Sequence, residues 1–374
     1  MNKKTMKKNL AIIGASYLQL PLIEKAKEMG FTTHVFAWAA NDVGERAADH
    51  FYPISITEVD RITEKCREIG ICGICSIATD LGNYTVNYVA DKLDLPGNSM
   101  ECTRKSTNKH LMRQAFSLHG DPSPKSELVD QYTDLSALDL EYPIIVKPTD
   151  RSGSRGIFKL DNPEGLKDAV KAAIEQSFEK KALVEEFAKG QEYSVEGISY
   201  QGMHHILAMT LKYTTGAPHF IETGHLEPAP VDAETYRKVV DVVTHALDTL
   251  EIRNSASHSE IKIDSDGKIR IIEIGSRMGG DCIGSDLVRY STGIDFVRAV
   301  IQVACGMEPD LIPTQDTCRV EVRFILTETD LKEFRRIQQE EPESILKIID
   351  DNHPDMIGKT TNSSDRAGCY LIKV

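Results

Sequence analysis

The sequence lacks any apolar run long enough to cross a membrane. Its start is rich in lysine, as a signal peptide would be, but the apolar run at residues 10–13 ends at once in Gly14. A signal peptide needs a longer apolar stretch, and a membrane helix needs about 20 apolar residues. These absences favour a cytoplasmic protein.

An excess of positive charge is also missing. The chain has 44 lysines and arginines against 57 aspartates and glutamates, which gives a net charge of −13. Nucleic acids and anionic membranes attract basic proteins, so neither is expected as a partner. A ligand that carries phosphate must then be bound by a few local lysines and arginines.

Cysteine is too sparse for a disulfide framework. The eight cysteines are scattered through 374 residues, whereas disulfide scaffolds are short and cysteine-dense. Cys72 and Cys75 form a C-x-x-C, a pattern found in redox and zinc sites, but no second pair follows. Both lie in the apolar run ICGICSIA, which favours a buried strand.

Two common nucleotide-binding motifs are absent. No Walker motif, G-x-x-x-x-G-K-[ST], occurs anywhere, and the stretch GASYLQLP after the first predicted strand lacks the three-glycine dinucleotide fingerprint. NAD binding is therefore not expected. The same stretch is expected to line a substrate cleft, because ligands of parallel sheets lie beyond the carboxyl ends of the strands.

The amino-terminal part alternates short apolar runs with amphipathic segments. Strands are predicted at residues 9–14, 31–39 and 71–78, and helices after the first strand to residue 29, at 58–69 and at 84–93. This alternation is typical of βαβ units in a parallel sheet. Further helices are predicted at 106–119, capped by Ser106 or Thr107, and at 285–305, and strands at 319–326 and 368–374. No chemistry is predicted after residue 305.

The strongest local signal is the stretch HSEIKIDSDGKIRIIEIGSRMGGD, residues 258–281. Asp266 and Gly267 predict a hairpin with these two residues at the centre of its turn. That register pairs Ile263 with Arg270, Ile261 with Ile272, and Glu260 with Glu273. Opposed carboxylates repel each other, so a cation is needed between them, and Mg²⁺ suits because one or two carboxylates plus phosphates commonly hold it. The alternative is an edge hairpin with both glutamates in water.

Several segments before the hairpin carry groups that suit a nucleotide. Lys147 ends a β-branched run just before a proline, which predicts a strand end. The loop TDRSGSRGI that follows is rich in hydrogen-bond donors and suits phosphates, or else is a flexible surface turn. Lys109 and Arg113 lie one turn apart on a predicted helix and could equally form a solvated basic face. The strand ALVEEF, followed by Glu192, could present backbone groups to a heterocycle.

In this order, the helix lysine, the strand-end lysine, the Gly/Ser loop, the VEEF segment with its later glutamate, and E…E-x-x-x-R-x-G-G resemble the ATP-grasp superfamily. Within it the chain resembles carboxylate–amine ligases of the L-amino acid ligase type, with a carbamoyl-phosphate-synthase-like ATP-grasp domain. The resemblance implies an α/β ATP-grasp architecture in three parts. These are a parallel-sheet N-terminal (pre-ATP-grasp) domain at residues 1–105, linker helices with a small lid at 106–188, and an α+β C-terminal domain with the metal and substrate site at 189–374.

The resemblance also implies roles for particular residues. The ATP phosphates would meet Lys109, Lys147, Ser152, Gly153, Ser154 and Gly156. Adenine and ribose would meet Glu185, Glu186, Ala188 and Glu192. Glu260 and Glu273 would bind Mg²⁺ or Mn²⁺, and Arg277 would neutralise the transferring phosphoryl group or the carboxylate that it meets. The usual E-x-N-x-R is here Glu273 to Arg277 with Gly275 at its centre, so the asparagine ligand is missing.

The implied activity is ADP-forming: a carboxylate becomes an acyl phosphate, and an amine then gives an amide or dipeptide. Glu222 and His225, three apart in a predicted glycine-flanked loop, are candidates for positioning the amine; a surface turn is the alternative for His225. His258 is either a neighbour of the metal ligand Glu260 or structural.

Small-molecule carboxylate and amine partners are expected, and a homodimer is compatible with the resemblance. Two alternatives stay open. One is another ATP-grasp chemistry, such as formyl- or carboxy-phosphate transfer in nucleotide biosynthesis or a carbamoyl-phosphate-synthase-like reaction. The other is an ATP-binding protein that has lost catalysis.

Overall fold

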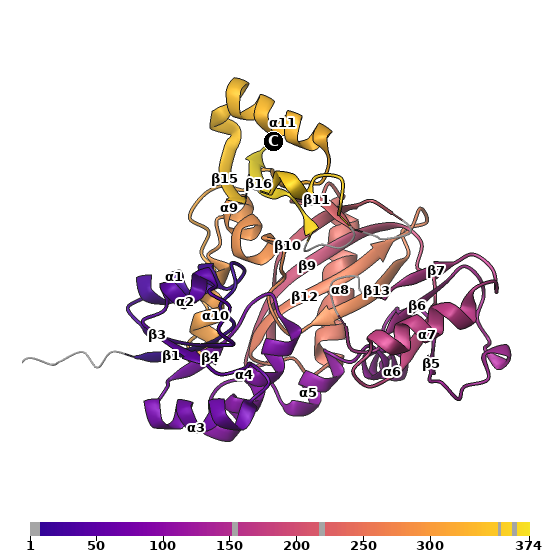
Figure 1. Cartoon of the computed structure of the whole chain (residues 1–374), viewed down its shortest axis with the longest axis horizontal. Helices are drawn as coiled ribbons and strands as arrows, with labels where there is room; N and C mark the ends of the chain where they lie inside the picture. Colours follow the sequence, from indigo (N-terminus) through magenta and orange to yellow (C-terminus); the bar gives the residue numbers. More distant parts are fainter. Residues whose placement is uncertain (1–7, 152–155, 217–220, 351–352, 361–364) are drawn as a thin grey trace, which may run out of the picture.

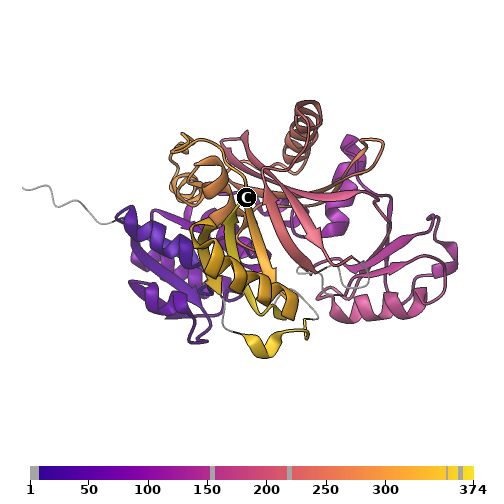
Figure 2. The same ribbon diagram turned by 90° about the horizontal axis from the view of Figure 1, so that it is seen from above.

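The computed structural model describes residues 8–151, 156–216, 221–350, 353–360 and 365–374. Three sheets organise the chain, and Figures 1 and 2 show them side by side along its longest axis. Within the described ranges, no helix is long and apolar enough to span a bilayer. The α/β fold class predicted from the sequence is confirmed.

The first sheet is parallel, as predicted, with strand order β3-β2-β1-β4. Its strands are β1 (Asn9–Ile13), β2 (Thr32–Ala37), β3 (His50–Pro53) and β4 (Gly73–Cys75). Its helices are α1 (Leu20–Glu28), α2 (Val43–Ala47), α3 (Val59–Ile69) and α4 (Asp80–Leu93). The short elements α2 and β3 were not predicted. Cys75 is buried in β4, whereas Cys72 precedes the strand and is half-buried.

The second sheet forms the lid, a small unit at one end of the molecule (Figure 1). Its order is β5-β8-β6-β7, and every neighbouring pair is antiparallel. The strands are β5 (Ser126–Val129), β6 (Ile144–Pro148), β7 (Phe158–Leu160) and β8 (Ala182–Glu186), covered by helix α7 (Leu166–Gln176), with a 3₁₀ turn η1 at Leu135–Ala137. Lys147 lies at the end of β6, where the sequence placed it.

The third sheet has eight antiparallel strands in the order β13-β12-β9-β10-β11-β14-β16-β15. The strands are β9 (Gln191–Tyr200), β10 (Met203–Thr214), β11 (Glu222–Glu227), β12 (Ser255–Ile263), β13 (Ile269–Gly275), β14 (Val320–Ile325), β15 (Ile345–Asp350) and β16 (Gly368–Lys373). The accompanying helices are α5 (Met100–Lys105), α6 (Lys109–His119), α8 (Ala233–Thr249), α9 (Val288–Thr292), α10 (Phe296–Ala304) and α11 (Glu328–Glu340), with short turns η2 (Ile283–Leu287), η3 (Pro342–Ser344) and η4 (Pro354–Met356).

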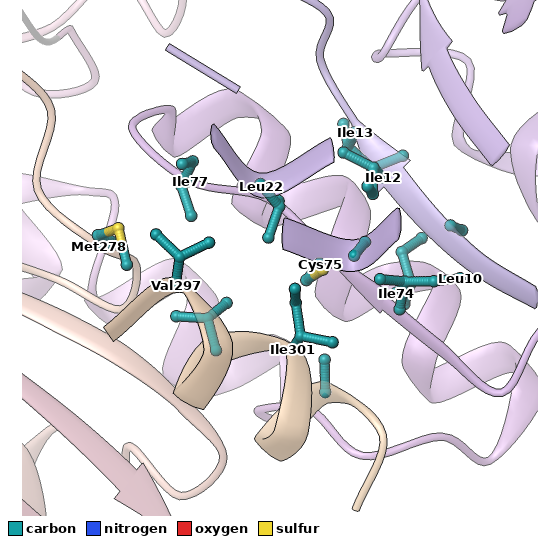
Figure 3. Packing of buried hydrophobic residues seen from close by; sticks show 14 of the residues in the cluster. Leu10, Ile12, Ile13, Leu22, Ile74, Cys75, Ile77, Met278, Val297 and Ile301 are labelled. Atoms are coloured by element: carbon teal, nitrogen blue, oxygen red, sulfur yellow. The ribbon is translucent and has the colours of Figure 1, made fainter. Parts of the chain in front are cut away.

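Helix α10 joins the first sheet to the large one. Figure 3 shows Val297 and Ile301 of this helix among the side chains of β1, α1 and β4. The same buried cluster includes Ile198 of β9 and Met278, which follows β13. The amide of Ala78 donates to the Met278 carbonyl at 3.2 Å. The carboxyl end of β4 is therefore held directly beside the end of the acidic hairpin.

Two predicted helices were wrong in their bounds. Residues 106–119 are not one helix: Ser106 ends α5, and its hydroxyl donates to the carbonyl of Cys102 at 2.9 Å. Helix α6 is capped instead by Asn108, whose side chain accepts from two backbone amides of the first turn. The predicted helix 285–305 breaks at Gly293, which takes a left-handed φ of 77°, and Asp295 then caps α10. Asparagine and aspartate cap helices as well as serine does, so the sequence alone did not decide between them.

Gly190, between β8 and β9, is expected to tolerate no side chain. It has a φ of +110°, and a Cβ there would lie 2.2 Å from the Ile263 carbonyl oxygen. Gly267 is the matched control, because its φ is +76° but nothing lies within 4 Å of its Cβ position. We expect Gly190→Ala to lower the free energy of unfolding by roughly 2–4 kcal/mol in urea denaturation, against roughly 1 kcal/mol for Gly267→Ala. Equal losses would contradict a steric role for Gly190.

Candidate active site

A cavity of about 180 Å³ lies between the lid and the face of β9, β10, β12 and β13. We call it the central cavity. It brings together residues that the sequence analysis selected from distant segments. They are Lys109, Lys147, Glu185, Glu186, Ala188, Glu192, Glu222, Glu260, Glu273 and Arg277. Of the predicted phosphate loop, Ser152, Gly153 and Ser154 lie outside the described residues, while Gly156 is described and takes a φ of 71°.

The hairpin β12–β13 places Glu260 directly opposite Glu273, as predicted. The register nearer the turn was wrong: Ile263 pairs with Ile269, and Ile261 with Ile271. The connecting loop runs through residues 264–268, and the Asp264 carboxylate accepts from two backbone amides in it. A bulge between Glu260 and Ile261 shifts the pairing by one residue. This shift restores the acidic pair that the simple two-residue turn had implied.

Each glutamate of the pair already contacts a buried lysine. Lys212 of β10 lies 2.6 Å from Glu260, and Lys109 of α6 lies 2.8 Å from Glu273. Burial alone would raise the pKa of Glu260, but Lys212 and His258 hold that pKa well below its ordinary value. Glu260 is therefore ionised in the fold. Lys212 was not predicted, because an isolated lysine in an apolar strand carries no motif.

His258 contacts Glu260 and Glu196, and its role beside a metal ligand stays a prediction. Its Nε2 lies 3.5 Å from Glu260, and its Nδ1 bonds to the fully buried Glu196. Burial lowers the pKa of His258, but Glu196 outweighs it and raises the pKa to about 9. Glu196 also accepts from the amide of Gly279 at 3.0 Å. Glu196 thus orients His258, and His258 in turn helps to orient Glu260 in the acidic pair.

A second buried charge cluster forms the lid side of the cavity. Glu185 contacts Lys147 and, at 3.2 Å, the Nε of Arg113. Burial is the largest influence on Lys147 and lowers its pKa, Arg113 lowers it further, and Glu185 offsets only part of this. The Glu185 carboxylate is thus held by two cations. A heterocycle bound at this position would therefore contact the backbone of Glu186 and Ala188, which line the same cavity.

Arg277 faces the first sheet. Its Nε donates to Asp80 at 2.7 Å, and Asp80 begins helix α4 just after β4. Burial would raise the pKa of Asp80, but Arg277 lowers it below its ordinary value. The sequence analysis missed Asp80, although an acidic residue just beyond a parallel strand is a signal that could have found it.

Glu222 and His225 do not lie in a glycine-flanked loop, as predicted, but in strand β11. Gly224 is not a turn residue: a Cβ there would lie 2.9 Å from the Val322 carbonyl oxygen, so glycine allows the close approach of β14. Glu222 lines the central cavity and contacts Arg366 at 3.0 Å. Arg366, in the part of the chain where no chemistry was predicted, thus contacts a residue that lines this cavity.

His225 is fully buried and does not line the central cavity. Neither ring nitrogen has a hydrogen-bond partner in the described structure, and burial together with Lys212 holds the pKa of His225 well below its ordinary value. The ring meets Phe324 edge-on, with centroids 5.4 Å apart. Arg366 stacks on the same Phe324 ring at 3.6 Å. His225 thus supports the partner of Glu222 through an aromatic ring.

Comparison with known proteins identifies the fold family. Residues 140–285 match the family model of the ATP-grasp domain. Over these residues the chain is similar to ATP-grasp domains, and the resemblance seen in the sequence is confirmed.

Several relatives by sequence are named as ligases. Alanine–anticapsin ligase of Bacillus subtilis is 26% identical over 73% of this chain and 62% of its own length. D-Alanine–D-alanine ligase of Pseudomonas fluorescens is 24% identical over 57% of this chain and 67% of its own length. The chain spans about half to three fifths of the length of the alanine–anticapsin ligases.

Solved structures share the fold over almost the whole chain. L-Amino acid ligase from Bacillus licheniformis superposes with a TM-score of 0.82 at 24% identity, covering 98% of this chain and 93% of that one. Phosphoribosylglycinamide synthetase from Anaerococcus prevotii gives 0.78 at 21%, with 98% and 94% covered.

Glu227 of β11 offers a test of the buried polar face of the large sheet. It is fully buried, one carboxyl oxygen accepts from Thr210 at 2.7 Å, and burial raises its pKa from 4.5 to about 8. Between pH 4.5 and pH 8 the folded state keeps a proton that the unfolded state releases. The stability that Glu227 contributes is therefore fully present below pH 4.5 and is lost as the pH rises from 4.5 to 8. We expect Glu227→Gln to remove this loss, gaining roughly 2–4 kcal/mol relative to the unaltered protein between pH 5 and pH 8.

Urea denaturation at the two pH values measures this difference. Glu234→Gln, at an exposed position on α8, is the control and should leave the pH dependence unchanged. If Glu227→Gln follows the same pH dependence as the unaltered protein, Glu227 is ionised in the fold and the assignment fails.

Proposed function

We propose that the protein is an ATP-dependent carboxylate–amine ligase that forms a C–N bond and releases ADP and phosphate. One observation carries the proposal. Within an ATP-grasp domain, Glu260 and Glu273 are directly opposed beside Lys109, Lys147 and Arg277, and all five line a single cavity. Two of its relatives by sequence, named alanine–anticapsin ligase and D-alanine–D-alanine ligase, support it.

The acidic pair fits a magnesium–nucleotide complex. Within the described residues, no group of three or more His, Cys, Asp and Glu is placed to hold a metal ion. Two carboxylates are enough for Mg²⁺ or Mn²⁺ when nucleotide phosphates complete the shell. Gly275, in place of the expected asparagine, leaves one protein ligand fewer. The ion, when bound, would supply charge neutralisation of the transferring phosphoryl group.

The lysines would bind the nucleotide. In this proposal Lys147 and Lys109 contact phosphates, the backbone of Glu186 and Ala188 contacts adenine, and Glu192 accepts from ribose hydroxyls. The division into residues 1–105, 106–188 and 189–374 belongs to the same proposal, because each sheet then supplies one wall of the reaction site. Gly156 and the loop residues before it would close over the phosphates.

The chemistry follows in two steps. A carboxylate oxygen attacks the γ-phosphorus. The bond between the γ-phosphorus and the oxygen that bridges the β- and γ-phosphates breaks, and ADP leaves. The amine nitrogen then attacks the acyl carbon, the C–N bond forms, and phosphate leaves as the nitrogen gives up a proton. Arg277 would neutralise charge on the phosphoryl group, and Glu222, held by Arg366, would orient the amine. The neutral His225 would support Arg366 through Phe324.

Glu273→Gln should lower phosphate release at least about 100-fold, because it removes one of two anionic ligands from the pair. The measurement is ATP-dependent phosphate release over a panel of amino acid pairs, with bicarbonate and formate as separate arms. Glu175→Gln, at an exposed position on α7, is the control. Full activity in Glu273→Gln would overturn the metal assignment. Release that depends on bicarbonate or formate, rather than on an acid and an amine together, would favour another ATP-grasp chemistry.

Lys147→Met should weaken nucleotide binding at least about tenfold, since a hydrogen bond to a charged group contributes about 1.5–3 kcal/mol. Methionine keeps most of the buried side-chain volume, and circular dichroism would check the fold. The binding constant for ATP or ADP is measured by calorimetry, with exposed Lys167→Ala of α7 as the control. Unchanged affinity in Lys147→Met would remove Lys147 from the nucleotide site.

A further inference from the structure

A second cavity, of about 700 Å³, lies between the first sheet and the lid. We call it the side cavity. One wall comes from the segments that follow β1, β2 and β4, including Ser16, Trp38 and Asp80. The opposite wall comes from Arg151 and Phe178 of the lid. Because ligands of parallel sheets bind beyond the carboxyl ends of the strands, the side cavity lies where a ligand is expected.

The side cavity meets the central cavity at a shared boundary. Lys109, Arg151 and Glu273 line both. Lys109 donates to Glu273 and, at 2.8 Å, to the carbonyl of Arg151, so these three residues form one connected group. A molecule in the side cavity would therefore have one end next to the acidic pair.

Large apolar side chains are exposed around this cavity. Trp38 is 54% exposed, Phe178 68%, Leu81 43% and Tyr84 39%, and all four line it. Exposed apolar groups that gather in a concave site mark a binding surface, since isolated ones would be scattered. Three of the four are aromatic, which suits a flat apolar group. Trp38 is also the single tryptophan of the chain.

Arg151, at the boundary of the two cavities, carries a positive charge with no carboxylate partner among the described residues. Arg151 stacks on the Phe178 ring at 4.4 Å, and its buried Nε has no hydrogen-bond partner in the described structure. Four of the acids that line the cavity have partners: Asp80 accepts from Arg277, Glu273 from Lys109, Asp150 from two backbone amides, and Glu179 from the side chain of Asn108. A guanidinium without a carboxylate partner favours an anionic group on the ligand.

We propose that the side cavity binds the acid substrate, and that this acid is a carboxylate with an aromatic or similarly large apolar group. The apolar group lies between Trp38, Tyr84 and Phe178. The carboxylate lies at the shared boundary beside Arg151, next to the cavity assigned to the nucleotide. The role as substrate rests on the proposed ligase function; the binding itself does not.

Trp38 fluorescence tests the binding directly in the full chain. The probes are 3-phenylpropionate, its neutral amide 3-phenylpropionamide, acetate and phenethylamine, each with and without a non-hydrolysable ATP analogue. We expect a saturable change with 3-phenylpropionate, at least about tenfold weaker binding of the amide, and no change with acetate. Arg151→Gln should remove the preference for the acid over the amide.

Two lid variants form a matched pair. Phe178→Ala should weaken 3-phenylpropionate binding at least about fivefold, since it removes one aromatic wall. Tyr132→Ala removes an aromatic side chain that is 85% exposed elsewhere on the lid, and it should leave binding unchanged. Equal behaviour of the two variants, equal binding of acid and amide, tighter binding of phenethylamine, or no response of Trp38 would each overturn the proposal.

Failure of this assignment is distinguishable from failure of the ligase function. Binding of 3-phenylpropionate without phosphate release for any acid–amine pair would contradict the ligase function but support an aromatic carboxylate as the ligand of the side cavity. Phosphate release with small acids such as alanine, with no binding of aromatic acids, would keep the ligase and overturn the side cavity as the acid site. Higher kcat/KM for phenylalanine than for alanine as the acid, lost in Phe178→Ala, would support both.

Discussion

The repulsion between two carboxylates on neighbouring strands is the constraint on which the rest of the site depends. Glu260 and Glu273 face each other across β12 and β13, and each is held by a lysine from a different element. Like charges placed this closely are destabilising unless cations lie beside them. Lys212 and Lys109 supply those cations, so the pair persists in the fold.

The same constraint explains why ion pairs join the three sheets around the cavities. Arg277 of the hairpin holds Asp80 of the first domain, and Lys109 holds Glu273 and the lid carbonyl of Arg151. Buried ion pairs contribute little net stability, because desolvation offsets most of the attraction. These contacts instead fix where Asp80, Glu273 and Arg151 lie relative to one another around the two cavities.

Local patterns predicted much of this arrangement. Alternation of strands and helices gave the parallel sheet, and strand periodicity put Glu260 opposite Glu273. The turn register was wrong because a bulge is a tertiary adjustment that no dipeptide signals. Asp80, Glu196 and Arg366 were missed for a related reason: each gains its meaning from a partner far away in the sequence. Gly224 led to the wrong prediction of a loop, because this glycine allows close packing of two strands and does not form a turn.

Lys109 lines both cavities, so a movement of its side chain would affect both of them. Its ammonium donates to Glu273 and to the Arg151 carbonyl, and Lys109 is 5% exposed. If Lys109 turns towards a phosphate, Glu273 loses its cation and the repulsion with Glu260 returns. A second cation must then arrive with the phosphate, so under the proposed function the site would favour a metal-bound nucleotide over a bare one. The same movement would break the hydrogen bond from Lys109 to the Arg151 carbonyl, which lies at the boundary of the two cavities.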